Sequence, residues 1–197
     1  MIRLFDIIFS LIGIFVLFPL MVIIYFLIII ESRGNGFYFQ NRVGRNSVNF
    51  KLIKFRSMWI GSDKNRLITV GGKDPRITRT GLFIRRFKLD ELPQLFNVFK
   101  GDMSLVGPRP EVSKYVNLYS PEQMKVLSVR PGITDYASIE YVDENEILGW
   151  ARDPEKVYLE VIMPDKIRLN MKYIQNRNTR EYFHVIFLTL CAVLKAK

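Results

Sequence analysis

The chain has 197 residues and a formal net charge of +10, and its length is sufficient for one domain with a hydrophobic core. The positive charge is concentrated: residues 42–88 hold thirteen basic and two acidic side chains, residues 1–41 are neutral, and residues 89–197 carry one net negative charge. Because Cys191 is the only cysteine and His184 the only histidine, an internal disulfide is excluded, and a metal site built from two histidines or from a histidine and a cysteine is not expected.

A hydrophobic run without a charged residue covers residues 7–30. At about 1.5 Å per residue, a helix of this length can cross a hydrocarbon core of roughly 30 Å. No small-residue cleavage site follows the run, so we expect a retained membrane helix rather than a signal peptide. Pro19, in the middle of the run, removes one helical hydrogen bond and predicts a kink. A kinked helix can span the bilayer or turn back, and the local sequence does not choose between the two.

The arginines that flank this run predict its orientation. One arginine precedes the run, whereas three follow it, at positions 33, 42 and 45. The positive-inside tendency therefore places the following residues in the cytoplasm. We divide the chain into a membrane helix, residues 1–33, and a membrane-associated cytoplasmic domain, residues 34–197.

Two short strands are predicted after a glycine-containing break, at residues 36–40 and 49–56, with a mostly polar turn between them. In the second strand Phe50 and Leu52 mark the buried face, and Lys54 points either into solvent or into a site. Residues 62–80 are polar and predict a surface loop.

The stretch RRFKLDELPQLFNVFKGDMSLVGPRPE, residues 85–111, joins an arginine pair, an acid pair and an arginine framed by prolines. Residues 81–87 predict a short helix. Residues 89–99 predict another, with Asp90 as its N-cap and a stop at Lys100-Gly101. The predicted buried face of this helix consists of Leu89, Leu92, Leu95, Phe96 and Phe99. Two prolines then hold Arg109 in extended backbone.

The rest of the chain predicts three further helices. One covers residues 121–127, with Ser120 as its cap, and an arginine-bearing turn follows it at residues 129–134. Another covers residues 153–174 and is divided at Pro164. The apolar stretch 182–194 is too short to span a membrane and predicts an amphipathic helix. The predicted fold class is α+β and mostly helical, with short strands and amphipathic interfacial helices behind a kinked N-terminal membrane helix.

Asp90 and Glu91 form an adjacent carboxylate pair, which by itself is an ordinary feature of a helix N-terminus. Their context favours a catalytic interpretation. One or two carboxylates, completed by substrate phosphates and water, are typical ligands of Mg²⁺. Arg85, Arg109 and Arg130 carry guanidinium groups that match phosphate oxygens. The sequence contains neither a Walker-type phosphate loop nor a Gly-x-Gly-x-x-Gly motif, which argues against kinases, ATPases and dehydrogenases.

Three segments resemble the signature blocks of the monotopic phosphoglycosyl transferases, the bacterial sugar transferase family. They are FKLIKFRSM at residues 50–58, KLDELPQLFNVFKGDMSLVGPRP at residues 88–110 and VRPGIT at residues 129–134. The resemblance extends over almost the full chain, including the N-terminal hydrophobic helix with its central proline. It is to the small form of the family, a catalytic domain without the additional transmembrane bundle of larger members.

This resemblance implies an activity. A phospho-sugar would be transferred from a UDP-sugar, with a preference for N-acetylated amino sugars, to undecaprenyl phosphate at the cytoplasmic face of the bacterial inner membrane, and UMP would be released. Asp90 would be the nucleophile of a covalent phosphosugar intermediate, and Glu91 would help to hold Mg²⁺. Substrate binding is assigned to Lys54, Arg85, Arg109 and Arg130. The resemblance also implies a re-entrant helix, bent at Pro19.

Two positions depart from the family pattern. Phe18 stands where the family has a serine before the proline, and Asp135-Tyr136-Ala137-Ser138 stands where it usually has Gly-Trp/Leu-Ala-Gln. The alternative function is a membrane-anchored, non-enzymatic module that binds anionic ligands through residues 42–88. Anionic membrane lipids are expected contacts and nucleic acid is not, while a homodimer is left open.

Overall fold

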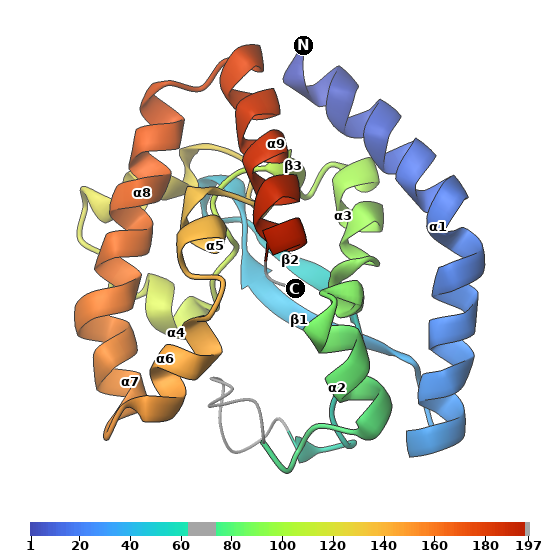
Figure 1. Cartoon of the computed structure of the whole chain (residues 1–197). Helices are drawn as coiled ribbons and strands as arrows, with labels where there is room; N and C mark the ends of the chain where they lie inside the picture. The colour runs from blue at the N-terminus through green and yellow to red at the C-terminus, as the bar shows by residue number, and fades with distance from the viewer. Residues whose placement is uncertain (63–73, 196–197) are drawn as a thin grey trace.

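The computed structural model describes residues 1–62 and 74–195, and its fold is mostly helical with two small sheets (Figure 1). The α+β class predicted from the sequence is confirmed. The surface loop predicted at residues 62–80 falls largely outside the described residues.

Helix α1 (Ile2–Ser32) is one continuous helix that contains Pro19. Among the described residues, it alone is long and apolar enough to cross a membrane. Its axis changes direction partway along, but the helix does not turn back on itself (Figure 1). The predicted apolar helix is therefore present, while its retention as a membrane helix and its re-entry stay predictions. Large side chains such as Phe15 and Ile30 are exposed along it, which suits a helix in contact with lipid.

The N-terminal end of α1 is bound to the rest of the chain by polar contacts. The Arg3 guanidinium donates hydrogen bonds to the carbonyl oxygens of Val98 and Phe99, at 2.6 and 2.8 Å. Asp6 is only 2% exposed, and its carboxylate accepts three hydrogen bonds. The donors are the Ser104 hydroxyl at 2.9 Å, the Leu105 amide at 3.0 Å and the Tyr182 hydroxyl at 3.0 Å. A buried carboxylate satisfied in this way fixes the first turns of α1 on the domain.

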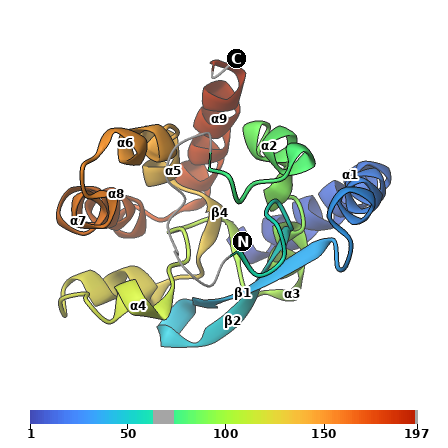
Figure 2. The same ribbon diagram turned by 90° about the horizontal axis from the view of Figure 1, so that it is seen from below.

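The C-terminal end of α1 is bound to the same domain. The Glu31 carboxylate accepts hydrogen bonds from the amides of Arg79 and Thr80, both at 2.8 Å, at the start of α2 (Arg79–Arg86). The Arg56 guanidinium donates to the Ser32 hydroxyl at 2.8 Å. Between the two ends, α1 packs against α2 and α3 (Gln94–Lys100), as Figure 2 shows from below.

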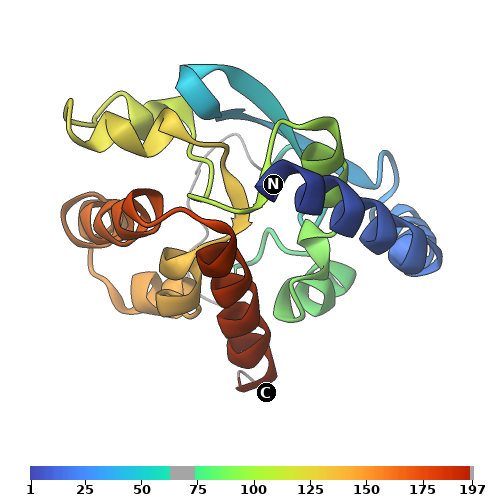
Figure 3. The ribbon, with the colours of Figure 1, turned by 90° about the horizontal axis from the view of Figure 1, so that it is seen from above.

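The predicted strands form an antiparallel hairpin. β1 (Phe37–Val43) pairs with β2 (Asn49–Phe55) in a register that places Phe37 opposite Phe55. A short turn, Arg45–Ser47, joins them. The two strands are confirmed, although β1 is longer than predicted. Seen from above, the hairpin and α9 (Thr179–Lys195) lie on opposite sides of the molecule (Figure 3).

A second sheet, which the sequence did not predict, joins two segments that carry arginine-bearing turns. β3 (Ser104–Val106) runs parallel to β4 (Gly132–Thr134). Gly107 and Gly132 allow the two backbones to touch, because a Cβ atom added to Gly132 would lie 2.1 Å from the Gly107 nitrogen. Each strand has only three residues, which is too short to show an alternating pattern, and for this reason neither strand was predicted.

The region between α2 and α3 corrects the prediction for Asp90. The chain forms a 3₁₀ turn, Leu89–Glu91, preceded by Lys88 in the left-handed region with φ 56°. α3 begins only at Gln94, after Pro93, so Asp90 does not cap this helix. The short helix before the turn and the stop at Lys100-Gly101 are confirmed; Gly101 has φ 101°.

The buried face of α3 also differs from the prediction. Phe96 and Phe99 are 36% and 45% exposed, whereas Asn97 is buried. The side chain of Asn97 donates to the Lys51 carbonyl at 2.8 Å and accepts from the Ile53 amide at 3.0 Å. The Asn97 amide thereby satisfies the backbone hydrogen-bonding groups at the free edge of β2. The stabilisation from these hydrogen bonds exceeds what burial of Phe96 and Phe99 would contribute.

The C-terminal half of the domain is a series of helices and helical turns: α4 (Ser113–Val116), η4 (Gln123–Ser128), α5 (Tyr136–Glu140), α6 (Glu144–Trp150), α7 (Pro154–Val157), the π-helical turn η5 (Tyr158–Ile162) and α8 (Met163–Gln175). The helix predicted at residues 121–127 begins only at Gln123, as the 3₁₀ helix η4, so its N-cap is Glu122 and the predicted cap at Ser120 is wrong. The Ser120 hydroxyl nevertheless accepts a hydrogen bond from the Gln123 amide at 3.3 Å. The helical region predicted to divide at Pro164 is continuous there, with the π-helical turn just before it.

Candidate active site

The acid pair lies in the turn between α2 and α3, where Lys54 from β2 and Arg109 from the Gly-Pro-Arg-Pro turn meet it. The Lys54 ammonium donates to Glu91 Oε1 at 2.9 Å. The Arg109 guanidinium donates to Glu91 Oε2 at 3.1 Å and also contacts Oε1, so it grips the carboxylate with two nitrogens. Three residues that the sequence assigned to the site are therefore in direct contact.

Lys54 points into the site because of strand alternation. It shares a face of β2 with Leu52, which is 3% exposed and packs in a cluster with Val98 and Met103. The sequence left open whether Lys54 points into solvent or into a site. The structure shows that it points toward the acid pair, because Lys54 lies on the same face of β2 as the buried Leu52.

Burial and charge oppose each other at Glu91. Burial by itself would raise the pKa of the Glu91 carboxyl, but the charges of Arg109 and Lys54, with the hydrogen bonds from both, hold this pKa well below its usual range. Glu91 in turn raises the pKa of Arg109. Burial lowers the pKa of Lys54, and the charge of Glu91 opposes this effect. Glu91 is thus an ionised, positionally fixed carboxylate at neutral pH.

Asp90 has a different environment from its neighbour. It is only 9% exposed, and no described residue donates a hydrogen bond to its carboxylate. Burial raises the pKa of Asp90; the nearby charge of Lys54 opposes this, and that of Glu91 reinforces it. A carboxylate without hydrogen bonds keeps its lone pairs free, and a raised pKa makes it a stronger base and nucleophile.

The three arginines predicted to hold phosphates do not all lie near the acid pair. Arg109 contacts Glu91 directly. Arg85 lies in the last turn of α2, close enough that its charge partly opposes the raised pKa of Asp90. No described residue forms an ion pair with the Arg85 side chain. Arg130 lies elsewhere: its Nε donates to the Gly101 carbonyl at 2.8 Å, at the end of α3. The structure therefore brings Arg85 and Arg109 to the acid pair, but not Arg130.

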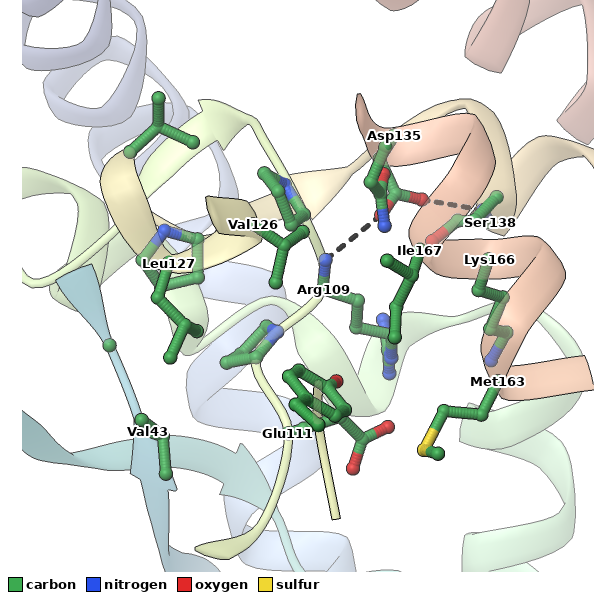
Figure 4. A pocket seen from close by; sticks show the side chains of 18 of the residues that line it. Val43, Arg109, Glu111, Val126, Leu127, Asp135, Ser138, Met163, Lys166 and Ile167 are labelled. Atoms are coloured by element: carbon green, nitrogen blue, oxygen red, sulfur yellow. Dashed lines mark hydrogen bonds between the residues drawn. The ribbon is translucent and has the colours of Figure 1, made fainter. Parts of the chain in front are cut away.

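Asp135 supports the site and was not assigned a role from the sequence. It is fully buried, and its Oδ2 accepts from the Arg109 amide at 2.9 Å while its Oδ1 accepts from the Ser138 amide at 2.5 Å (Figure 4). The residue thus caps α5 and fixes the backbone of Arg109 at once. The sequence did carry a signal for this role, because an aspartate three residues before Ser138 has the spacing of a helix N-cap, and it directly follows an arginine-bearing turn.

A cavity of about 40 Å³ adjoins the Gly-Pro-Arg-Pro turn on the side of α8 (Figure 4). Arg109 lines this cavity, and its guanidinium binds Glu91, so this residue connects the cavity with the acid pair.

The acid pair also bears on the predicted Mg²⁺. Among the described residues no group of three or more His, Cys, Asp or Glu side chains could hold a metal ion. Mg²⁺ nevertheless needs only one or two carboxylates when substrate phosphates complete its shell. Asp90 has no hydrogen-bonded partner within the described part of the chain, and Glu91 Oε2 has a single one there, Arg109. This oxygen donor set fits a Mg²⁺ ion that arrives with a phosphorylated substrate.

The chain is similar to proteins of a known family. Residues 1–196 match the family model described as bacterial sugar transferase. A Bacillus subtilis protein is 47% identical over 120 residues, which are 61% of this chain and 67% of its own length. Its name assigns it, provisionally, as an undecaprenyl-phosphate N-acetylgalactosaminyl 1-phosphate transferase.

Two longer relatives align with almost the whole chain. The UDP-N-acetylgalactosamine-undecaprenyl-phosphate N-acetylgalactosaminephosphotransferase of Aeromonas hydrophila is 36% identical over 96% of this chain and 42% of its own length. The UDP-glucose:undecaprenyl-phosphate glucose-1-phosphate transferase of Xanthomonas campestris is 35% identical over 98% of this chain and 38% of its own length. The chain therefore spans about two fifths of the length of these two relatives.

Proposed function

This chain belongs to the bacterial sugar transferase family, and from that premise we propose that it transfers a phospho-sugar from a UDP-sugar to undecaprenyl phosphate. The products are undecaprenyl-diphosphate-sugar and UMP, and the reaction is the first membrane step of glycoconjugate assembly. The observation that carries the proposal is the pairing of two unlike carboxylates: Asp90, buried without hydrogen bonds from the described residues, and Glu91, held by Lys54 and Arg109.

The proposed reaction has two displacements at the same phosphorus. In the first, an Asp90 carboxylate oxygen attacks the phosphorus that bears the sugar, and the bond from that phosphorus to the UMP oxygen breaks. UMP leaves, and the phospho-sugar is covalently bound to Asp90. In the second, an oxygen of undecaprenyl phosphate attacks this phosphorus, and the bond to the Asp90 oxygen breaks. The carboxylate is thereby regenerated.

The remaining side chains position and neutralise charge. Arg109 is held by Asp135 at its backbone and by Glu91 at its guanidinium, so its orientation is set before substrate arrives. Arg85, which pairs with no described residue, is available to phosphate oxygens. Bound Mg²⁺, held by Glu91, would supply positive charge to the diphosphate and ease departure of UMP.

The sugar is proposed to be an N-acetylated amino sugar. The support is the printed names of the Bacillus and Aeromonas relatives, both of which specify N-acetylgalactosamine. The Xanthomonas relative is named for glucose, so family membership alone does not select the substituent.

We also propose that α1 dips into the cytoplasmic leaflet of the inner membrane and that both of its ends stay on the cytoplasmic side. Arg3 and Asp6 near one end, and Glu31 and Ser32 at the other, bind the same domain. A straight span with the domain on one face would separate one of these ends from its partners. The basic residues of the block 42–88 would then contact anionic lipid headgroups.

Release of UMP tests the proposed function. Purified full-length protein in lipid nanodiscs is mixed with undecaprenyl phosphate, Mg²⁺ and a panel of UDP-sugars. UMP formation that requires both the UDP-sugar and the lipid phosphate supports the transferase. Binding of UDP-sugar without UMP release from any member of the panel would instead favour a non-enzymatic, anion-binding module.

A further inference from the structure

The lining of the cavity beside Arg109 includes a polar residue that the proposed reaction does not use. Asn170 is 5% exposed, it lines the cavity, and its Oδ1 has no hydrogen-bond partner among the described residues. Unpartnered buried polar atoms are uncommon in folded proteins and cost free energy. Asn170 lies on one stripe of α8 with Met163 and Ile167, and both of these are apolar. A polar residue within a buried apolar stripe needs a partner from outside the helix.

The charged groups around the cavity already have partners. Lys166 forms an ion pair with Glu144, and the Tyr158 hydroxyl donates to Glu111. Asp135 accepts from the amides of Arg109 and Ser138. An additional charge would therefore find no free counter-charge among the described residues of this wall. The free polar atom belongs to a neutral amide, which suits a neutral hydrogen-bonding group.

The other lining residues and the volume of the cavity further limit which chemical group can bind there. Apolar side chains, including Val126, Leu127 and Ile167, border the cavity (Figure 4). Since a water molecule needs about 10–15 Å³ of such volume, a cavity of about 40 Å³ accommodates roughly three waters or a substituent of a few heavy atoms. A group with an N–H donor and a methyl group matches one free acceptor and an apolar surround. An acetamido group has both.

The position of the cavity relates it to the reaction. Arg109 grips Glu91 beside Asp90 and also lines the cavity. In a sugar-1-phosphate, the carbon that carries the 2-substituent is bonded to the carbon that carries the phosphate. A phosphate held at Asp90 and Arg109 thus leaves the 2-substituent within reach of the cavity. From this geometry, and building on the proposed function, we infer that the cavity is the subsite for the 2-acetamido group and that Asn170 accepts a hydrogen bond from its N–H.

The test compares two donors that differ only in this substituent, UDP-N-acetylgalactosamine and UDP-galactose. Dissociation constants are measured by titration calorimetry on the full-length protein in nanodiscs, and kcat/KM by UMP release. Asn170→Leu removes the acceptor at similar volume, and Ala137→Val narrows the cavity from α5, where Ala137 is 1% exposed. Asn176→Ala, at an exposed position just after α8, is the matched control.

The wild type is expected to bind the acetamido donor at least about tenfold more tightly than UDP-galactose, and Asn170→Leu should reduce that preference roughly tenfold. Ala137→Val should reduce it as well, and Asn176→Ala should leave it within about twofold. Equal wild-type affinities for the two donors, or an unchanged preference in Asn170→Leu, would show that the cavity holds only water and overturn the inference. A binding preference without UMP release would support the subsite and refute the transferase, so the two failures are distinguishable. If a variant does not fold, the wild-type binding ratio decides.

Discussion

The carboxylate of Asp6, in the second turn of α1, accepts a hydrogen bond from the hydroxyl of Tyr182 in α9, at 3.0 Å, although the two residues lie 176 positions apart. Ser104 and Leu105, at the start of β3, donate to the same carboxylate. The first turns of the apolar helix α1, the parallel sheet and helix α9 therefore meet at one buried acid. This contact and those at Glu31 set the frame in which the acid pair is held.

The first prediction concerns the proposed nucleophile. Asp90→Asn should lower turnover by roughly four orders of magnitude or more and eliminate the covalent phosphosugar adduct, because an amide does not attack phosphorus as a carboxylate does. Asp102→Asn, which alters an acid paired with the exposed Lys100, is the control and should retain activity. Intact-protein mass spectrometry after mixing with UDP-sugar makes the measurement, and an adduct on the Asp90→Asn variant would refute the assignment.

The second prediction concerns Glu91. Glu91→Gln should reduce activity about tenfold to a hundredfold and raise the Mg²⁺ concentration needed for half-maximal rate, since a charged oxygen ligand becomes neutral. The variant should also melt at a lower temperature, because Lys54 and Arg109 lose their buried counter-charge. Glu146→Gln, at an exposed position, should change neither quantity. An unaltered Mg²⁺ titration would argue that Glu91 orients Arg109 without binding metal.

The third prediction separates charge from shape at Arg109. Arg109→Lys keeps one positive charge but cannot grip Glu91 with two nitrogens. Loss of one charge-assisted hydrogen bond should lower kcat/KM roughly tenfold to a hundredfold. The exposed Arg86, on the same helix as Arg85, provides the control Arg86→Lys. Rates in Arg109→Lys close to those of the wild type would mean that the backbone of this turn matters more than the guanidinium.

The fourth prediction is a pH dependence. Asp90 must be ionised to attack, and burial raises its pKa, so kcat/KM should rise with pH through a limb above the usual aspartate range. Lys54 is the strongest influence that lowers this pKa. Lys54→Met removes the positive charge, disfavours the ionised form and should move the limb to higher pH.

Lys51→Met is the matched control for this shift, because Lys51 is exposed on the opposite face of the same strand. Its pH profile should superimpose on that of the wild type. A limb that moves to lower pH in Lys54→Met would contradict the electrostatic account of Asp90.

The fifth prediction concerns membrane topology. A single cysteine introduced as Ile2→Cys, in a Cys191→Ser background, should resist a membrane-impermeant thiol reagent supplied from the periplasmic side of intact cells. Pro19→Ala should increase labelling, because restoring the helical hydrogen bond favours a straight span. Efficient labelling of the otherwise unchanged protein would show that the helix spans the bilayer.

Prediction from the sequence succeeded where a local pattern carried the signal. The apolar run and the two strands depend on composition and periodicity over short distances. Lys54 and Arg109 contact Glu91 as expected of residues assigned to one site, while the catalytic role of the acid pair stays a prediction. The resemblance of the central motif supplied the chemistry that these patterns alone do not specify.

Prediction failed where partners far apart in the sequence decided the outcome. Asn97 is buried because its amide completes the edge of β2, and no pattern within α3 encodes that edge. Asp135 binds Arg109 across 26 positions, a contact that no local pattern encodes. The contacts of α1 with β3 and α9 are of the same kind.

The attachment of α1 at both ends has a consequence for anyone who wishes to prepare a water-soluble fragment. Deleting residues 1–33 would leave the buried hydroxyl of Tyr182 and the donors of Ser104 and Leu105 without their acceptor. At about 1–3 kcal/mol for each unpaired donor, the loss is a large share of a typical domain stability of roughly 5–15 kcal/mol. The apolar surfaces of Phe55 and Ile84, now covered by α1, would also be exposed and promote aggregation. The hydrophobic helix is therefore an integral part of the folded protein, and it cannot be removed as though it were only an anchor.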